Sequence, residues 1–437
     1  MAKDSFILGA CYLSHVAPED GKGATIGRCL YGAFENTKLE TELALVGSDG
    51  TSTMTGYKTG AIRTLECLCG RPLSRSICQL HMNELPLRHI VMILDGTTKS
   101  PDAFSGKIGK NLNDIVSTWK VVKFKPIRDT KVLDQLLSYP DNVVEDLSTD
   151  QNYGYKICLA ILTGDMPKTL ALREIGPLCH ARWLTLACRV LRYYVSQKNP
   201  SKNLKDIAEF CVKVYFPSWF NIKKNKYITD GPRNLHFLVE KTMSFPDKKV
   251  RDIAMRYIQI NAYFAHPENI LLGMLNDDDQ EVRNVAVNIV LKQRGDDISD
   301  VDGEDLLPNE FEGGYISDED GNVGEANESS DIRYFKVPKI NNKAKVYYKL
   351  VNMKEEKFEE PPILRKLRTH EIENFRNEKL VLRHPCHSQA VERSVKVVSE
   401  ACAEVIGFQR RDGLIRQTLK SRKLQPKVDC KKHYYQK

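Results

Sequence analysis

The chain has 437 residues, 41% of them hydrophobic, which is enough to bury a core in roughly two or three domains. Lys and Arg number 65 against 57 Asp and Glu, a formal net charge of +8. No run approaches the roughly 18 apolar residues of a membrane span, and the first residues lack the apolar stretch of a secretion signal. We therefore expect an intracellular protein, nuclear or cytoplasmic, that is neither secreted nor bound in a membrane.

The positive charge is unevenly distributed. Residues 295–332 contain 14 Asp and Glu and no Lys or Arg, so the rest of the chain holds 65 basic and 43 acidic residues. A basic body suits a polyanionic partner such as DNA, and a solvated basic surface without a ligand is the alternative. The acidic stretch has few large apolar residues, so we expect a disordered linker over residues 295–332.

The first part of the chain alternates short apolar runs with helical patterns. Residues 23–35 and 61–69 are predicted as helices, and residues 43–46 and 76–80 as short buried strands. This alternation predicts a small α/β unit with partly parallel strands over residues 1–110. The carboxyl ends of such strands are where sites form, and Asp49 ends the apolar run that begins with the first strand.

Long helical periods from residue 111 to residue 294 predict an all-α domain. Within it, residues 250–254 and 282–286 repeat a Val-Arg-x-hydrophobic-Ala pattern, each after an acidic turn. The repeat is similar to the second helix of a HEAT-type pair, but two units are too few for an independent solenoid. We expect a solenoid-like pair inside a larger helical domain.

Two short motifs have ordinary structural interpretations beside functional ones. Arg182-Trp183 is predicted at a helix start, where Trp packs against the core and Arg stays in water, or where the pair positions a site. Residues 104–110 read Phe-Ser-Gly-Lys-Ile-Gly-Lys, which lacks the order of a P-loop, so an ordinary loop is predicted.

The twelve cysteines are scattered without the spacing of a disulfide scaffold. Cys78-x-x-His81 and Cys67-x-Cys69 suggest a zinc site. The spacing of the second pair is too short for the usual zinc geometry, however, and no other regularly spaced pair completes four ligands. We expect reduced, mostly buried thiols and no zinc or other resident cofactor.

The remainder of the chain is divided by composition and periodicity. Residues 333–364 are predicted to end the insertion, residues 365–425 to form a C-terminal helical part of the α/β core, and residues 426–437 a basic tail. Glu392-Arg393 lies near the start of a helical stripe of apolar residues.

These landmarks resemble, in identity and order, the hAT (hobo–Activator) superfamily of DDE transposases. The landmarks are a strand-end Asp49, Cys78-x-x-His81, Arg182-Trp183 and Glu392-Arg393. Residues 80–89, 261–269 and 387–393 carry a closer likeness to transposase-derived proteins.

The resemblance implies an RNase H-like core interrupted by a large all-α insertion. In this family, carboxylates from separate elements hold Mg²⁺ for phosphoryl transfer, and here they would be Asp49 and Glu392. The resemblance assigns supporting roles to Cys78, His81, Arg182, Trp183 and Arg393. The family's first strand and Asp would precede Phe6, so we expect an N-terminally truncated derivative in which Asp49 and Glu392 are vestigial.

A metal site with two of three carboxylates loses both charge and geometry, so we predict a catalytically inactive protein that binds nucleic acid or partner proteins. One alternative is a Mg²⁺-dependent DNA transposase or nuclease, should an upstream segment supply the missing strand and Asp. The other is a helical interaction scaffold, binding other proteins or itself, for which nucleic acid is irrelevant.

Overall fold

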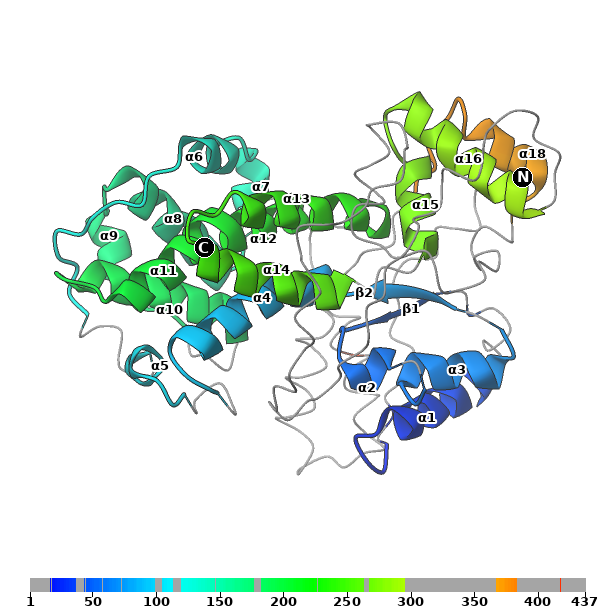
Figure 1. Ribbon diagram of the computed structural model, residues 1–437, viewed down its shortest axis with the longest axis horizontal. Coiled ribbons are helices and arrows are strands. Elements are labelled where there is room, and N and C mark those ends of the chain that lie inside the picture. Colours follow the sequence, from blue (N-terminus) through cyan, green and yellow to red (C-terminus); the bar gives the residue numbers. More distant parts are fainter. Residues whose placement is uncertain are drawn as a thin grey trace. The chain divides into compact units, whose positions relative to one another are not determined.

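The computed structural model describes residues 16, 18–36, 43, 45–56, 58–71, 73–98, 104–112, 119–145, 147–176, 182–225, 227–262, 267–294, 367–382 and 417. These residues are mostly helical and include a two-stranded parallel sheet (Figure 1). The chain divides into two compact units. The first comprises residues 1–43, 51–72 and 387–437, and the second comprises residues 44–50 and 73–386.

The first unit contains α1 (Gly23–Asn36), α2 (Ser52–Thr55) and α3 (Ala61–Cys69). The two longer helices confirm the helices predicted at 23–35 and 61–69. They pack closely because glycines face the contact: a Cβ added to Gly27 would lie 2.7 Å from both the Ala61 carbonyl oxygen and Thr64 Cβ. Helix α3 ends at Gly70, whose φ of 64° is the left-handed conformation that glycine adopts readily.

The sheet of the second unit consists of β1 (Leu45–Ser48) and β2 (Ser74–Ile77). The strands run parallel, with Leu45 opposite Ser74 and Ser48 opposite Ile77. The N–H of Cys78 donates to the Ser48 carbonyl at 2.8 Å, and α4 (Gln79–Leu94) begins at the next residue. The predicted parallel strand pair is confirmed, while the larger sheet of an RNase H-like core is not seen among the described residues.

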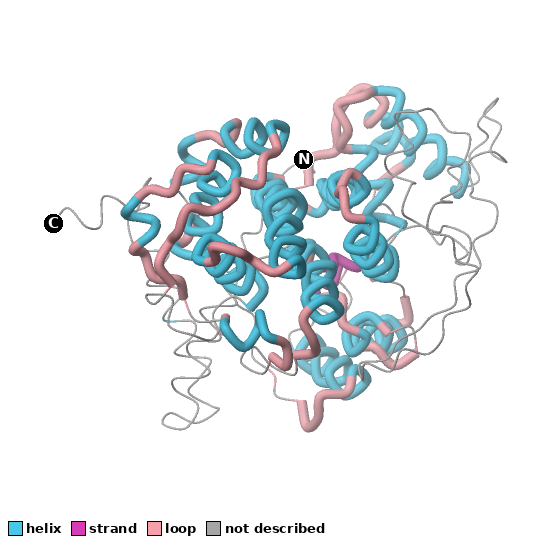
Figure 2. The backbone as a smooth tube through the Cα atoms, turned by 60° about the vertical axis from the view of Figure 1, so that its left-hand side comes forward, coloured by secondary structure: helices cyan, strands magenta, loops and turns pink. Residues whose placement is uncertain are grey.

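The rest of the second unit is a helical body, which confirms the predicted all-α region (Figure 2). Its largest fully buried side chains include Trp219, Tyr153 and Phe216. Helix α14 packs against α4, and α10 packs against α8. The elements are α5 (Lys107–Asn111), α6 (Thr130–Leu137), α7 (Asp141–Glu145), α8 (Thr149–Thr163), α9 (Lys168–Ala171), α10 (Arg182–Ser196), α11 (Lys202–Phe210), a π-helix (Cys211–Tyr215), α12 (Phe216–Lys224), a 3-10 turn (Ile228–Asp230), α13 (Gly231–Met243), α14 (Lys248–Ala262), α15 (Pro267–Leu275), α16 (Gln280–Arg294) and α18 (Thr369–Asn374).

Helices α11 and α12 form one continuous rod through the π-helix. Pro217 has no N–H to donate and its ring would clash with an α-helical carbonyl, and a wider π turn is one way to accommodate it. Side chains from other elements satisfy carbonyls at this turn. Asn83 Nδ2 donates to the Tyr215 carbonyl at 3.1 Å, and Gln135 Nε2 donates to the Pro217 carbonyl at 3.1 Å.

The sequence repeat corresponds to a repeated helix-entry turn. Arg251 Nη1 donates to the Phe245 carbonyl at 3.2 Å, and Arg283 Nη1 donates to the Asp277 carbonyl at 2.8 Å. Each arginine thereby closes the acidic turn that lies before its own helix, α14 or α16. Helix α13 contacts both α14 and α15, so two successive helical hairpins are joined within the body, as the solenoid-like pair predicts.

A second hydrophobic cluster lies at α15 and α16. It includes Leu271, Val287 and Val290, together with Ile372 of α18 and Leu380. Residues 367–382, which the sequence predicts in the C-terminal part of the α/β core, include α18, which packs against α16 in the second unit (Figure 1). That unit also holds β1 and β2, and Leu45 of β1 packs against the same cluster. None of the described helices combines the length and apolar character that a membrane span requires.

Candidate functional site

The predicted strand-end residues lie at the carboxyl edge of the β1–β2 pair. Asp49 follows β1 and is exposed, Cys78 precedes α4, and His81 lies in the first turn of α4, both half-buried. Burial lowers the pKa of His81, the Asp49 carboxylate raises it, and Arg88 lowers it further. The Asp49 charge therefore acts on the imidazole of His81 at the strand edge, and a shared role of these residues in a site stays a prediction.

The other predicted site residues are not brought to this edge by the described part of the chain. Trp183 is 5% exposed and belongs to the hydrophobic core of the helical body, which is the ordinary interpretation of the motif. Helix α10 begins at Arg182, as predicted, and that residue's side chain is not described. Glu392 and Arg393 lie outside the described residues, so the pairing of Asp49 with Glu392 stays a prediction.

Cysteine and carboxylate chemistry is limited in the residues that the structure describes. Among them, no group of three or more His, Cys, Asp or Glu side chains is placed to hold a metal ion. Cysteines 29, 67, 69, 78, 158, 188 and 211 are free thiols. Burial raises the pKa of the Cys158, Cys188 and Cys211 thiols, which keeps them protonated and unreactive.

A second candidate site lies on residues 119–131, a segment that periodicity did not single out. We call it the basic strap. It lacks regular structure up to residue 129, where α6 follows, and its backbone is tied to two helices of the body. The Val122 N–H donates to the Val195 carbonyl of α10 at 3.1 Å, and the Ile127 N–H donates to the Ile161 carbonyl of α8 at 3.1 Å. The basic strap therefore bridges the C-terminal ends of α10 and α8.

Side chains add further anchors to the basic strap. Arg192 Nη2 donates to the Trp119 carbonyl at 2.8 Å, and the Tyr194 hydroxyl donates to the Lys125 carbonyl at 2.7 Å. Arg192 is 3% exposed, and its Nη2 also donates to the Ala171 carbonyl of α9, so this guanidinium binds backbone carbonyls of the strap and of α9. Helix α10 thus supplies three of these anchors, and α8 supplies the one at Ile127.

In the basic strap, apolar side chains pack against the core and cationic side chains are exposed. Trp119 is buried, and Val121, Phe124 and Ile127 are half-buried and pack against the core. The exposed side chains include Lys120, Lys123, Lys125, Arg128 and Lys131. None of these five cations forms an ion pair with a residue that the structure describes.

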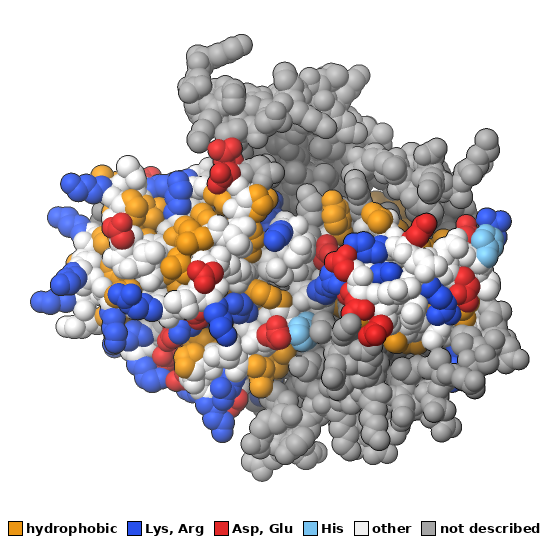
Figure 3. All heavy atoms as spheres, turned by 90° about the horizontal axis from the view of Figure 1, so that it is seen from above, with side chains coloured by type: hydrophobic (Ala, Val, Ile, Leu, Met, Phe, Trp, Pro, Cys, Tyr) orange, Lys and Arg blue, Asp and Glu red, His pale blue; other side chains and the backbone are white. Residues whose placement is uncertain are grey.

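Acidic neighbours do not neutralise the basic strap. Its one carboxylate, Asp129, accepts a hydrogen bond from the Val132 N–H at 3.1 Å and caps α6. Burial lowers the pKa of Lys241 on α13; Asp129 raises it and Lys131 lowers it, so a further cation lies near this end of the strap. On one face of the molecule, Lys and Arg side chains gather over its left-hand part (Figure 3). The basic strap therefore carries five exposed cations against one carboxylate of its own, and these cations form no ion pair with the described part of the chain.

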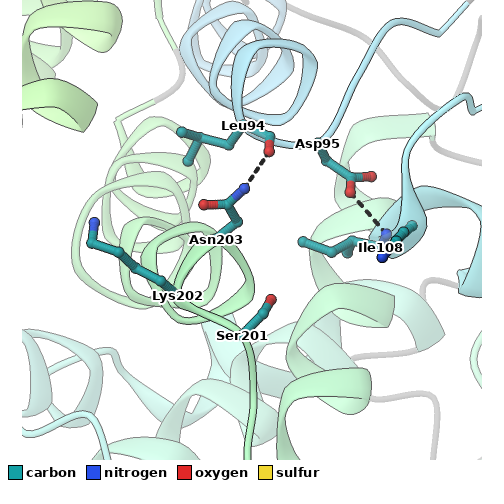
Figure 4. Close-up of a pocket in the computed structure, with 7 residues that line it drawn as sticks. Leu94, Asp95, Ile108, Ser201, Lys202 and Asn203 are labelled. Atoms are coloured by element: carbon teal, nitrogen blue, oxygen red, sulfur yellow. Dashed lines mark hydrogen bonds between the residues drawn. The ribbon is translucent and has the colours of Figure 1, made fainter.

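A hollow of about 410 Å³ lies between the end of α4 and the starts of α5 and α11 (Figure 4). The Asp95 carboxylate accepts from the Ile108 N–H at 2.8 Å and from the Gly109 N–H at 2.7 Å. These are the N–H groups that would face a phosphate in a P-loop, so a carboxylate of the chain already occupies that place. Lys202 Nζ donates to Asp206 at 2.8 Å and to Asp247 at 3.1 Å. The charged side chains at this hollow therefore hold helices of the protein together.

No protein-family model, curated protein or solved structure matches the chain. The resemblance to hAT transposases therefore stays a prediction from the sequence motifs. The case for a function depends on the geometry of the basic strap and of the strand-end residues.

Proposed function

We propose that the protein is a catalytically inactive, transposase-derived protein that binds nucleic acid through the phosphate backbone. The observation that carries the proposal is the set of five exposed cations on the basic strap, on a backbone held by hydrogen bonds and without ion pairs to the described residues. Binding a polyanion there would break no existing salt bridge, and the anchored backbone would lose little conformational freedom.

The composition of the basic strap favours phosphate over other anions. Four of its five cations are lysines, which interact with phosphate as mobile point charges, and a series of such contacts releases condensed counterions. An acidic protein partner would need carboxylates spaced to match the same lysines. Nucleic acid offers regularly repeated charge and needs no such match.

In this proposal the strand-end residues have no catalytic role. Asp49 is a vestigial metal ligand, and Cys78 and His81 stabilise the junction between β1 and α4. Two-metal phosphoryl transfer needs several carboxylates around the metal ions, and the described residues bring no group of three metal-binding side chains together at Asp49. Replacement of Asp49 by Asn is therefore expected to leave nucleic-acid binding unchanged.

Fluorescence anisotropy with labelled duplex DNA at 50 and 200 mM salt, with Mg²⁺ present and the products run on a gel, tests the proposal. If all five cations engage phosphates, affinity falls on the order of 10²–10³-fold between these salt concentrations, and no cleavage occurs. Strand cleavage that is abolished by Glu392→Gln would establish the active transposase or nuclease instead. Absence of binding at 50 mM salt would favour the helical scaffold.

A further inference from the structure

We infer that the basic strap binds duplex nucleic acid along its phosphates and reads neither bases nor single strands. This inference rests on the proposed function and specifies its ligand. It follows from which side chains of the strap are exposed, how its backbone is held, and how long it is.

Single-strand binding is disfavoured because the basic strap offers no stacking platform. Proteins that bind single strands combine positive charge with exposed aromatic rings on which unpaired bases stack. The strap has two aromatic residues, and both face inward: Trp119 is 7% exposed, and Phe124 packs against the core. Its exposed side chains are Lys, Arg and Thr, which hold phosphates but give unstacked bases no surface.

Base readout in a duplex is disfavoured because the strap cannot enter a groove. Direct readout places a helix or a β-ribbon inside the major groove, where side chains meet base edges. The strap instead lies against the body, with hydrogen bonds at Val122 and Ile127 holding its backbone to α10 and α8. Lysine tips alone then reach the ligand, and phosphates are the groups that they meet first.

The length of the basic strap sets the number of contacts. Lys120 and Lys131 are eleven residues apart, which spans at most about 36–40 Å at roughly 3.3–3.6 Å per residue. One turn of B-form DNA is about 34–36 Å long. The strap therefore covers no more than about one turn and contacts up to five phosphates. The slope of log K against log salt should then lie near −4 to −5, since each phosphate contributes about −0.9.

The test compares four probes with the full-length protein: two 24-base-pair DNA duplexes of unrelated sequence, an RNA duplex and one of the DNA single strands. We expect the three duplexes to bind within about threefold of one another and the single strand at least about fivefold more weakly. The triple variant K120Q/K123Q/K125Q should lower duplex affinity by on the order of 10²-fold at 0.1 M salt and reduce the slope by about 3.

The matched control is K205Q/K248Q/K249Q, which removes three exposed lysines from α11 and α14 of the same unit. It should change duplex affinity by less than about fivefold, and circular dichroism should show both triple variants folded. Three results would overturn the inference: a single strand that binds as tightly as the duplexes, a strong preference for one sequence, or duplex binding that is unchanged in K120Q/K123Q/K125Q. None of these results would contradict nucleic-acid binding by the protein. Failure of all four probes to bind at 50 mM salt would instead overturn the proposed function.

Discussion

The Tyr194 hydroxyl on α10 donates a hydrogen bond of 2.7 Å to the backbone carbonyl of Lys125, in the middle of the basic strap. Tyr194 is buried, so a hydroxyl deep in the helical body determines where an exposed cation is presented. The charge of the strap and the packing of the body are coupled at this bond.

Tyr194→Phe should therefore loosen the basic strap without removing any charge. We expect a loss of about 1 kcal/mol in unfolding free energy, because the Lys125 carbonyl loses its donor. We also expect faster amide exchange at Val122 and Ile127, measured by hydrogen–deuterium exchange mass spectrometry. Tyr155→Phe is the control: its hydroxyl donates to the Leu136 carbonyl of α6 at 3.0 Å, outside the strap. Equal exchange in the two variants would show that the bond to Lys125 does not hold the strap.

Asp95 should stabilise the start of α5, since its carboxylate accepts from two N–H groups of that helix. Asp95→Ala is expected to lower the free energy of unfolding by about 1–2 kcal/mol, the usual cost of losing a helix cap. Urea denaturation followed by circular dichroism measures this loss. The exposed Asp134 provides the comparison: Asp134→Ala should stay within about 0.5 kcal/mol of the native chain, and a similar loss in both variants would contradict the capping role.

His89 should make the second unit less stable in mild acid. Its ring stacks on Tyr257 with 3.3 Å between centroids, and burial, together with Arg88 and Arg256, lowers its pKa from 6.5 to about 4. Between these two values the unfolded chain binds a proton that the folded chain does not. Stability therefore falls as pH falls through this window, by up to about 1.4 kcal/mol per pH unit.

Replacing His89 by Phe keeps a ring against Tyr257 and removes the titration. The stability lost between pH 7.5 and pH 5.0, measured by urea denaturation, should shrink by about 1–2 kcal/mol. Some pH dependence should remain, because burial also lowers the pKa of His81. An unaltered pH profile in His89→Phe would refute the assignment.

Two glycines of α1 should respond oppositely to the same substitution. Gly27→Ala places a methyl group 2.7 Å from the Ala61 carbonyl oxygen and Thr64 Cβ, and we expect a net loss of about 1–2 kcal/mol from overpacking. Gly32 has open space around its Cα, so Gly32→Ala should stabilise the helix by about 0.5–1 kcal/mol. Thermal unfolding compares them, and a stabilised Gly27→Ala would mean that α1 and α3 do not approach this closely.

Periodicity and turn chemistry predicted much of the regular structure. The helices at 23–35 and 61–69 and the parallel strand pair follow from local patterns. The repeat at Arg251 and Arg283 was visible as spacing. The role of each arginine in closing the turn before its helix was not visible, because spacing alone does not tell which carbonyl, six residues back, the side chain reaches.

The basic strap escaped prediction for a physical reason. It has neither a helical nor a regular alternating pattern, and its path is set by Tyr194, Arg192 and Val195, which lie about seventy residues further along the chain. The one local signal was five cations interleaved with apolar residues between Trp119 and Lys131. The capping of α5 by Asp95 is likewise a contact between separated segments. The only local signal for it is the Gly-rich sequence of residues 104–110, which is similar to a phosphate-binding loop.

The π-helix at Cys211–Tyr215 changes the phase of the rod that contains it. An α-helix turns about 100° per residue, and a π turn takes up one residue more than an α turn, so the side chains of α12 point in directions that an uninterrupted helix would not give them. Trp219 and Phe220 are buried in that shifted phase. A one-residue deletion between Cys211 and Tyr215 would remove the extra residue, restore the regular ladder and leave both rings directed at the core. The π turn is therefore the place in this rod where the chain can lose a residue without turning Trp219 and Phe220.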